Sequence, residues 1–138
     1  MLTILTALAA LSACTAARWY LDRTSRRESE YAGGRLRLRA MWNGGAAFGL
    51  PIRKTALPAA SLAALGMLWT QRRRSPVGVG LSLGGGLSNL LERLRRGSVY
   101  DYIQFPKAPG RLKRYVFNLA DFAILLGGVC LALRRKKR

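Results

Sequence analysis

The sequence predicts an all-α integral membrane protein, a four-transmembrane-helix bundle that forms a single domain over residues 1–138 and carries a small β-like loop on the membrane surface. Hydrophobic residues make up 50% of the chain and fall into four blocks that are nearly free of charge. A helix needs about 20 such residues to cross a bilayer. The basic residues lie between the blocks and at the C-terminus, where lipid headgroups would be.

We expect the four helices at approximately residues 2–21, 55–71, 75–94 and 115–133. The first block is apolar apart from Arg18, and the fourth is apolar apart from Asp121. The two middle blocks are uncharged but short, so their helices should extend into the flanking residues.

The start of the first block lacks the basic segment of a cleaved signal peptide, because Met1 to Ile4 carry no side-chain charge. Leu11 to Cys14 have the form of a lipobox, the site at which bacterial lipoproteins are acylated and cut, but the apolar stretch continues past Cys14. We therefore expect an uncleaved helix with a small-residue packing face and a buried thiol.

The third block is rich in glycine, with a run from Gly78 to Gly86. A nucleotide-binding fingerprint would need a preceding strand and a different spacing. In a lipid-embedded helix, glycines three and four residues apart let a neighbouring helix approach closely. These glycines therefore predict helix packing.

The first loop contains a strict alternation of arginine and leucine over residues 35–39. This is the period of a strand, and turn-prone glycines stand on both sides of it. We expect a strand that lays its leucines on the membrane surface and turns its arginines to water.

The composition excludes several kinds of chemistry. The chain has no histidine, which removes Ser-His-Asp and Cys-His catalysis and nearly every zinc site. Cys14 and Cys130 both fall in apolar blocks, so a disulfide framework is not expected. We expect no metal and no cofactor. The net charge of +18 would suit nucleic acid in a soluble protein, but its distribution favours anionic membrane lipids, and we expect no nucleic-acid partner.

Two of the six acidic residues stand in apolar surroundings. Asp101 lies in the run from Val99 to Ile103, and Asp121 begins the fourth block. A charge near the middle of a bilayer costs about 2.5–3.5 kcal/mol on insertion scales. Two carboxylates brought together form an acid/base pair, because close like charges leave one of them protonated.

Polar residues accompany the two aspartates at the ends of elements that should lie on one side of the membrane. They come from the first loop, from the end of the third helix, and from the start of the fourth. Spacings of three and four residues place each group on one helix face. The residues are Asn43; Asn89, Glu92 and Arg93; and Asn118 with Asp121.

These residues form four motifs that resemble signal peptidase II, the bacterial lipoprotein signal peptidase. The family pattern is Asn-x-Gly-Ala-x-Phe, Gly-Gly-x-x-Asn-x-x-Asp-Arg, Gly-x-Val-x-Asp-Phe and Phe-Asn-x-Ala-Asp. The chain has counterparts at residues 43–48, 85–93, 97–102 and 117–121. Asp22 with Arg26 is similar to the family's Asp-x-x-x-Lys after the first helix.

The resemblance implies a membrane aspartic endopeptidase that removes the signal peptide from diacylglyceryl-modified prolipoproteins, cutting before the lipidated cysteine. Asp101 and Asp121 would be catalytic, through an activated water. The remaining motif residues would bind substrate or order the site: Asn43, Gly45, Asn89, Arg93, Asn118, Ala120, Asp22 and Glu92. The implied protein is a monomer in the bacterial cytoplasmic membrane, with cytoplasmic termini and its active site and β-like loop toward the outer face. A plain count of basic residues favours the opposite orientation.

The chain departs from the family pattern at several positions. Glu92 stands in place of Asp, and its extra methylene would change a pairing with Arg93; Arg26 replaces Lys; and Phe122 replaces a small polar residue. Two alternatives follow. The chain is a catalytically weak homologue that binds lipoproteins or lipid, or it is a small membrane scaffold or transporter subunit whose aspartates bind ions or protons.

Overall fold

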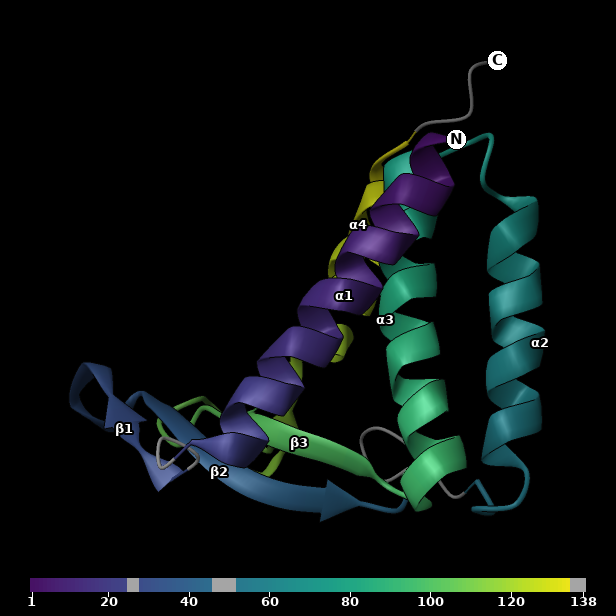
Figure 1. Cartoon of the computed structure of the whole chain (residues 1–138). Helices are drawn as coiled ribbons and strands as arrows, with labels where there is room; N and C mark the ends of the chain where they lie inside the picture. Colours follow the sequence, from purple (N-terminus) through teal and green to yellow (C-terminus); the bar gives the residue numbers. More distant parts are fainter. Residues whose placement is uncertain (25–27, 46–51, 135–138) are drawn as a thin grey trace.

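The computed structural model describes residues 1–24, 28–45 and 52–134, and it places a group of helices on one end of a small sheet (Figure 1). The helices are α1 (Leu2–Arg23), α2 (Leu57–Thr70), α3 (Pro76–Arg96) and α4 (Leu119–Leu133). The strands are β1 (Glu30–Tyr31), β2 (Leu36–Asn43), β3 (Val99–Gln104) and β4 (Val116–Phe117), and short 3-10 turns lie at Ala32–Gly34 and Leu112–Arg114. The N-terminus and the end of α4 lie at the opposite end of the helices from the sheet.

All four expected helices are present, with one displaced boundary. The fourth helix starts at Leu119 rather than near residue 115, because Val116 and Phe117 pair with β3 as strand β4. Asn118 then serves as the N-cap of α4.

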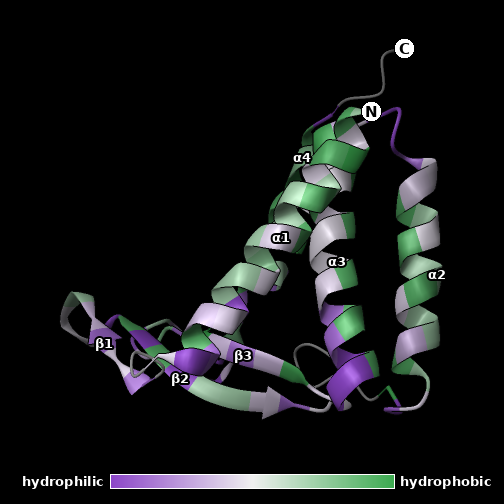
Figure 2. Ribbon diagram, in the orientation of Figure 1, coloured by the Kyte–Doolittle hydropathy of each residue, from purple (hydrophilic) through white to green (hydrophobic). Residues whose placement is uncertain are grey.

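The expectation of four membrane spans is met only in part by helix length and composition. Within the described residues, α1 is the one helix both long and apolar enough to cross a membrane, while α2 and α4 are shorter apolar helices. Figure 2 shows apolar residues along α1, α2 and α4 and a hydrophilic end of α3 beside the sheet. Many of the large apolar side chains of the helices are exposed.

The helices pack through the predicted glycine contacts, with α3 between α1 and α4. A Cβ built on Gly84 would lie 2.5 Å from the carbonyl oxygen of Ala7 in α1, and one on Gly85 would lie 2.6 Å from that of Ala120 in α4. Any larger side chain at these two positions would push the helices apart.

The sheet is antiparallel, with the order β1-β2-β3-β4. Its longest pairing joins β2 to β3, where Met41 is opposite Asp101 and Asn43 is opposite Val99. The segment between the expected third and fourth helices therefore contains strand β3. The expected β-like loop is the first half of a real sheet.

The expected direction of the leucines in β2 is wrong for Leu38. It packs against a buried cluster of Leu21, Tyr100 and Tyr102, so it faces the protein rather than a membrane surface. The reason is the pairing of β2 with β3, which brings this face of the sheet against the end of α1. Arg39 is exposed, as expected.

Candidate active site

Strand β3 positions the first of the two predicted aspartates. Successive strand side chains point to opposite faces, so Asp101 faces away from the cluster that holds Tyr100 and Tyr102. Gly97 ends α3 with a positive φ of 72°, which lets the chain turn sharply into β3. The Asp101 carboxylate is buried; its Oδ1 accepts a hydrogen bond from Asn118 Nδ2 at 2.8 Å and its Oδ2 accepts one from Asn43 Nδ2 at 3.2 Å.

The first turn of α4 positions the second aspartate. Asn118 and Asp121 form a capping box: Asp121 N donates to Asn118 Oδ1 at 3.1 Å, and Asn118 N donates to Asp121 Oδ2 at 2.8 Å. The other oxygen of Asp121, Oδ1, accepts from Asn89 Nδ2 of α3 at 3.2 Å. A helix N-terminus and these hydrogen bonds stabilise a negative charge, which offsets part of the cost of burying the Asp121 carboxylate.

Asn118 connects the two aspartates. Its side chain is 1% exposed, and its amide nitrogen donates to Asp101 and also to Asn89 Oδ1, at 3.1 Å. The same residue closes the capping box with Asp121. The structure thus brings together the two carboxylates that the sequence paired.

Both carboxylates line a cavity of about 670 Å³ between the sheet, α3 and α4. Much of the rest of the lining is apolar and comes from the segment that precedes and begins α4, with one contribution each from β2, β3 and the loop after β3. These residues include Met41, Val99, Phe105, Leu112, Val116, Phe117, Phe122, Ile124 and Leu125.

The environment of Asp101 raises its pKa from 3.8 to about 6. Burial is the largest cause, and the charge of Asp121 adds to it; the hydrogen bonds from Asn118 and Asn43 and the charge of Arg93 act in the opposite direction. Asp101 therefore retains a proton at a pH where an exposed aspartate is ionised.

Arg93 of α3 and Gly45 of the first loop support the site. Arg93 Nη2 of α3 donates to the carbonyl oxygen of Gly45 at 3.2 Å, and Gly45 N donates to Asn43 Oδ1 at 2.9 Å. This turn fixes the amide of Asn43, whose nitrogen then faces Asp101. The rest of that motif, residues 46–48, lies outside the described residues, as does Arg26.

A family model described as signal peptidase (SPase) II matches residues 4–135. The chain belongs to the signal peptidase II family. It is similar to the lipoprotein signal peptidase of Nitrobacter hamburgensis, with 36% identity over 102 residues (65% of this chain and 62% of the relative), and to that of Moorella thermoacetica, with 36% identity over 123 residues (81% and 78%). The chain spans about three fifths of the length of the first of these and of the Methylorubrum extorquens relative.

The fold also matches a solved structure described as a bacterial membrane enzyme. The TM-score is 0.81 at 21% identity, and the match covers 98% of this chain and 92% of that one. The sheet and the four helices are thus the signal peptidase II fold.

Glu92 pairs with two other arginines rather than with Arg93. Its carboxylate lies 2.6 Å from Arg18 of α1 and 3.5 Å from Arg96. Adjacent residues of a helix point in different directions, so Glu92 faces α1 while Arg93 faces the cavity. This departure from the family pattern therefore lies outside the cavity lining.

Of the remaining residues singled out from the sequence, some lie at the cavity and others lie away from it. Ala120 is fully buried and packs where α4 meets Gly85 of α3, so it sets the position of Asp121 through its small size. Asp22 is half-buried near the end of α1 and does not line the cavity with Asp101 and Asp121, the aspartate dyad. Phe122 lines the cavity and contacts Phe105 and Phe117.

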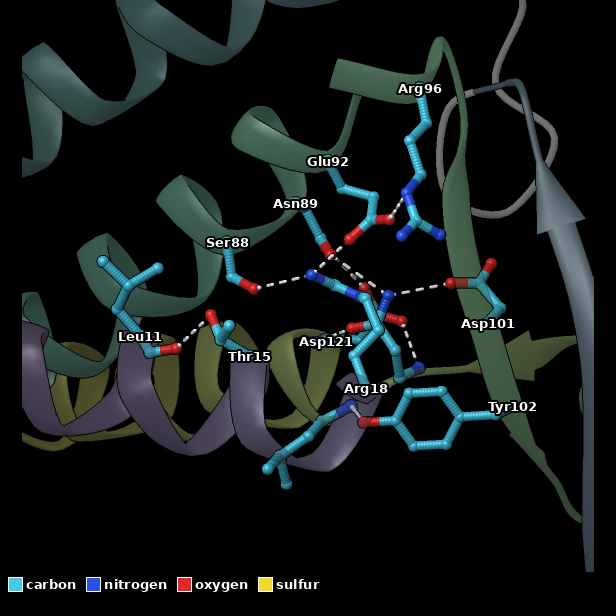
Figure 3. A network of polar contacts seen from close by, with 12 residues as sticks. Leu11, Thr15, Arg18, Ser88, Asn89, Glu92, Arg96, Asp101, Tyr102 and Asp121 are labelled. Atoms are coloured by element: carbon cyan, nitrogen blue, oxygen red, sulfur yellow. Dashed lines mark hydrogen bonds and ion pairs between the residues drawn. The ribbon is translucent and has the colours of Figure 1, made fainter. Parts of the chain in front are cut away.

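Sequence reasoning missed two residues next to the dyad. Arg18 interrupts the first apolar block in the sequence, and Figure 3 shows it directed at Ser88 and Glu92. Tyr102 accepts a hydrogen bond from the Leu119 N–H at 3.0 Å, which ties β3 to the start of α4. A charge inside an otherwise apolar block was the available signal for Arg18. Among the described residues, no three His, Cys, Asp or Glu side chains form a candidate metal site.

Proposed function

We propose that this chain is a membrane aspartic endopeptidase that removes the signal peptide from diacylglyceryl-modified prolipoproteins, cutting before the lipidated cysteine. The observation that carries the proposal is the pair Asp101 and Asp121, which line one cavity and are joined through Asn118. The names of the relatives support the choice of substrate.

We propose different roles for the two aspartates on the basis of their surroundings. Asp121 accepts a backbone and an amide hydrogen bond at a helix N-terminus, which suits the ionised base. Asp101, with its pKa raised to about 6, suits the acid that keeps the shared proton.

In the proposed mechanism, the peptide bond is hydrolysed in two steps. Asp121 takes a proton from water, whose oxygen bonds to the scissile carbonyl carbon, while Asp101 gives its proton to the carbonyl oxygen. In the second step the carbon–nitrogen bond breaks. Asp121 passes its proton to the leaving amine, and Asp101 recovers a proton from a hydroxyl of the intermediate. Both carboxyl groups return to their starting states.

The apolar cavity lining suits a lipid-modified peptide. Aromatic and aliphatic side chains such as Phe105, Phe117 and Leu125 surround the polar dyad. Binding there would remove both the acyl chains and the apolar signal segment from lipid without exposing them to water.

We further propose that all four helices span the bacterial cytoplasmic membrane in a monomeric protein, with the termini in the cytoplasm and the sheet toward the outer face. The exposed apolar side chains of the helices support contact with lipid. Arginines near both ends, such as Arg73 and Arg39, would lie at anionic headgroups.

The test is a gel-shift assay. Purified protein in detergent micelles would be incubated with a diacylated prolipoprotein and, separately, with the same precursor lacking the diacylglyceryl group. Cleavage of the first to a faster-migrating product that keeps the lipid supports the proposal. Failure to cleave the diacylated precursor contradicts it, and would favour a binding protein without peptidase activity.

A further inference from the structure

A buried ion pair joins α1 to α3 directly behind the dyad. Arg18 Nη1 lies 2.6 Å from Glu92 Oε2 and donates to Ser88 Oγ at 3.2 Å (Figure 3). The Arg18 and Glu92 side chains are 11% and 8% exposed. Few charged pairs are so enclosed, and this one is not part of the cavity lining.

The pair acts on the same turns of α3 that hold the dyad. Ser88 and Glu92 are four residues apart and face α1, where they hold Arg18. Asn89 and Arg93, one position further on, face the cavity, where Asn89 donates to Asp121. A rotation of α3 that breaks the contacts with Arg18 therefore also moves Asn89 away from Asp121.

The charge balance of the pair also affects the dyad. Arg18 interacts electrostatically with Asp121, and Glu92 neutralises it at short range. Without Glu92, a buried cation would be left near two carboxylates that must share one proton. Glu92, which stands where the family pattern has Asp, is thus paired with an arginine of α1.

We infer that Arg18 is a positioning residue for the proposed proteolysis, and that Glu92 pairs with it to hold α3 and to neutralise its charge beside the dyad. The inference rests on the proposed function. On this inference, Glu92 forms a functional ion pair with Arg18, and its presence does not indicate weak activity.

The test is a double-mutant cycle on cleavage of the diacylated prolipoprotein, with Arg18→Gln, Glu92→Gln and the combined variant. Each single change leaves a buried charge without its main partner, so we expect kcat to fall about 10-fold or more with little change in KM. The combined variant should recover to within about 3-fold of wild type, because neither charge remains. Arg18→Lys should keep part of the activity lost in Arg18→Gln.

The pH profile gives a readout that loss of packing alone would not produce. Glu92→Gln leaves an uncompensated cation, which favours loss of the shared proton, so the alkaline limb should move to lower pH. Arg18→Gln leaves Glu92 and should move it to higher pH. The titratable or charged groups around the dyad are Arg18 and Cys14 of α1, Glu92, Arg93 and Arg96 of α3, Tyr102 of β3, and Arg114 and Tyr115 before α4.

The control is Glu30→Gln, which breaks an exposed ion pair with Arg37 in the sheet; neither residue lines the cavity. It should match wild type in kcat and pH profile. If wild type cleaves and the single variants at Arg18 and Glu92 behave like this control, or if their losses simply add in the combined variant, the inference is wrong.

Two further measurements cover the cases in which wild type is inactive or a variant does not fold. If wild type does not cleave, the proposed function fails, and coupling between Arg18 and Glu92 in thermal unfolding still decides whether the pair holds the helices together. If a Gln variant does not fold, Arg18→Lys and Glu92→Asp replace it in the cycle, and effects of these two changes that simply add would overturn the inference.

Discussion

Asn118 Nδ2 lies 2.8 Å from Asp101 Oδ1, so the residue that caps helix α4 also holds a carboxylate of strand β3. One side chain thereby couples the start of a helix to the acid of the proposed dyad. Its burial leaves it no alternative hydrogen-bond partners in solvent.

Replacing either carboxylate should abolish cleavage. In Asp101→Asn or Asp121→Asn the pair can no longer share a single ionisable proton, and we expect cleavage to fall at least about 1,000-fold. The measurement is the gel-shift assay on membranes that contain equal amounts of inserted protein. Wild-type rates in either variant would refute the dyad.

The two roles of Asn118 can be separated by substitution. Asn118→Ser keeps an N-cap oxygen for α4 but lacks the amide hydrogens that reach Asp101 and Asn89. We expect thermal unfolding within about 1 kcal/mol of wild type but a cleavage rate about 100-fold lower. Asn118→Ala should lower both the thermal stability and the cleavage rate. Equal activity in Asn118→Ser and wild type would show that Asn118 acts only as the N-cap of α4.

Asp101 should titrate near pH 6, and its pKa should fall in Asp121→Asn. The charge of Asp121 is one cause of the raised value, so its removal lowers the pKa, although burial keeps it above 3.8. Infrared or carbon NMR spectroscopy of labelled aspartate carboxyl groups would measure both values. An unchanged pKa would mean that the two carboxylates do not interact.

The same pKa makes a prediction for stability. A carboxyl group whose pKa rises from 3.8 to about 6 on folding binds its proton more tightly in the folded state. Its contribution is therefore fully present below about pH 4, declines as the pH rises to about 6, and is absent above that, a change of about 3 kcal/mol. Thermal unfolding across this range should show the decline in wild type. Asp101→Asn should lack this component, and identical pH dependence in both proteins would contradict the assignment.

Chelators and serine or thiol reagents should not inhibit cleavage. The chain has no histidine to activate a serine or thiol nucleophile or to ligate zinc, and Cys14 is buried. Rates with and without a chelator, and after a maleimide, would be compared in the gel-shift assay. Strong inhibition by the chelator would exclude a metal-free mechanism.

The proposed topology can be tested with exposed cysteines. In a background with Cys14 and Cys130 replaced by alanine, Arg39→Cys in β2 and Arg73→Cys between α2 and α3 both place a thiol at an exposed position. An impermeant reagent added to intact cells should label the first only. Labelling of the second alone would place Asp101 and Asp121 at the cytoplasmic side.

The four helices, the glycine contacts of α3 and the pairing of the two aspartates were predictable from the sequence. These features depend on local signals: the lengths of apolar blocks, glycine spacing, and short motifs that place Asp101 soon after one helix ends and Asp121 where the next begins. Family membership followed from the same motifs and is confirmed.

The tertiary structure alone decided which further residues, Arg18 and Tyr102 among them, lie beside those aspartates. Strand β3 lacks a simple alternation of apolar and polar residues, and it forms because β2 and β4 pair with its two edges. Arg18 and Ser88 are 70 residues apart, and no local pattern predicts that they meet or that Glu92 pairs with Arg18 rather than with Arg93. Such contacts depend on how α1 crosses α3, which is set by the packing of the whole bundle.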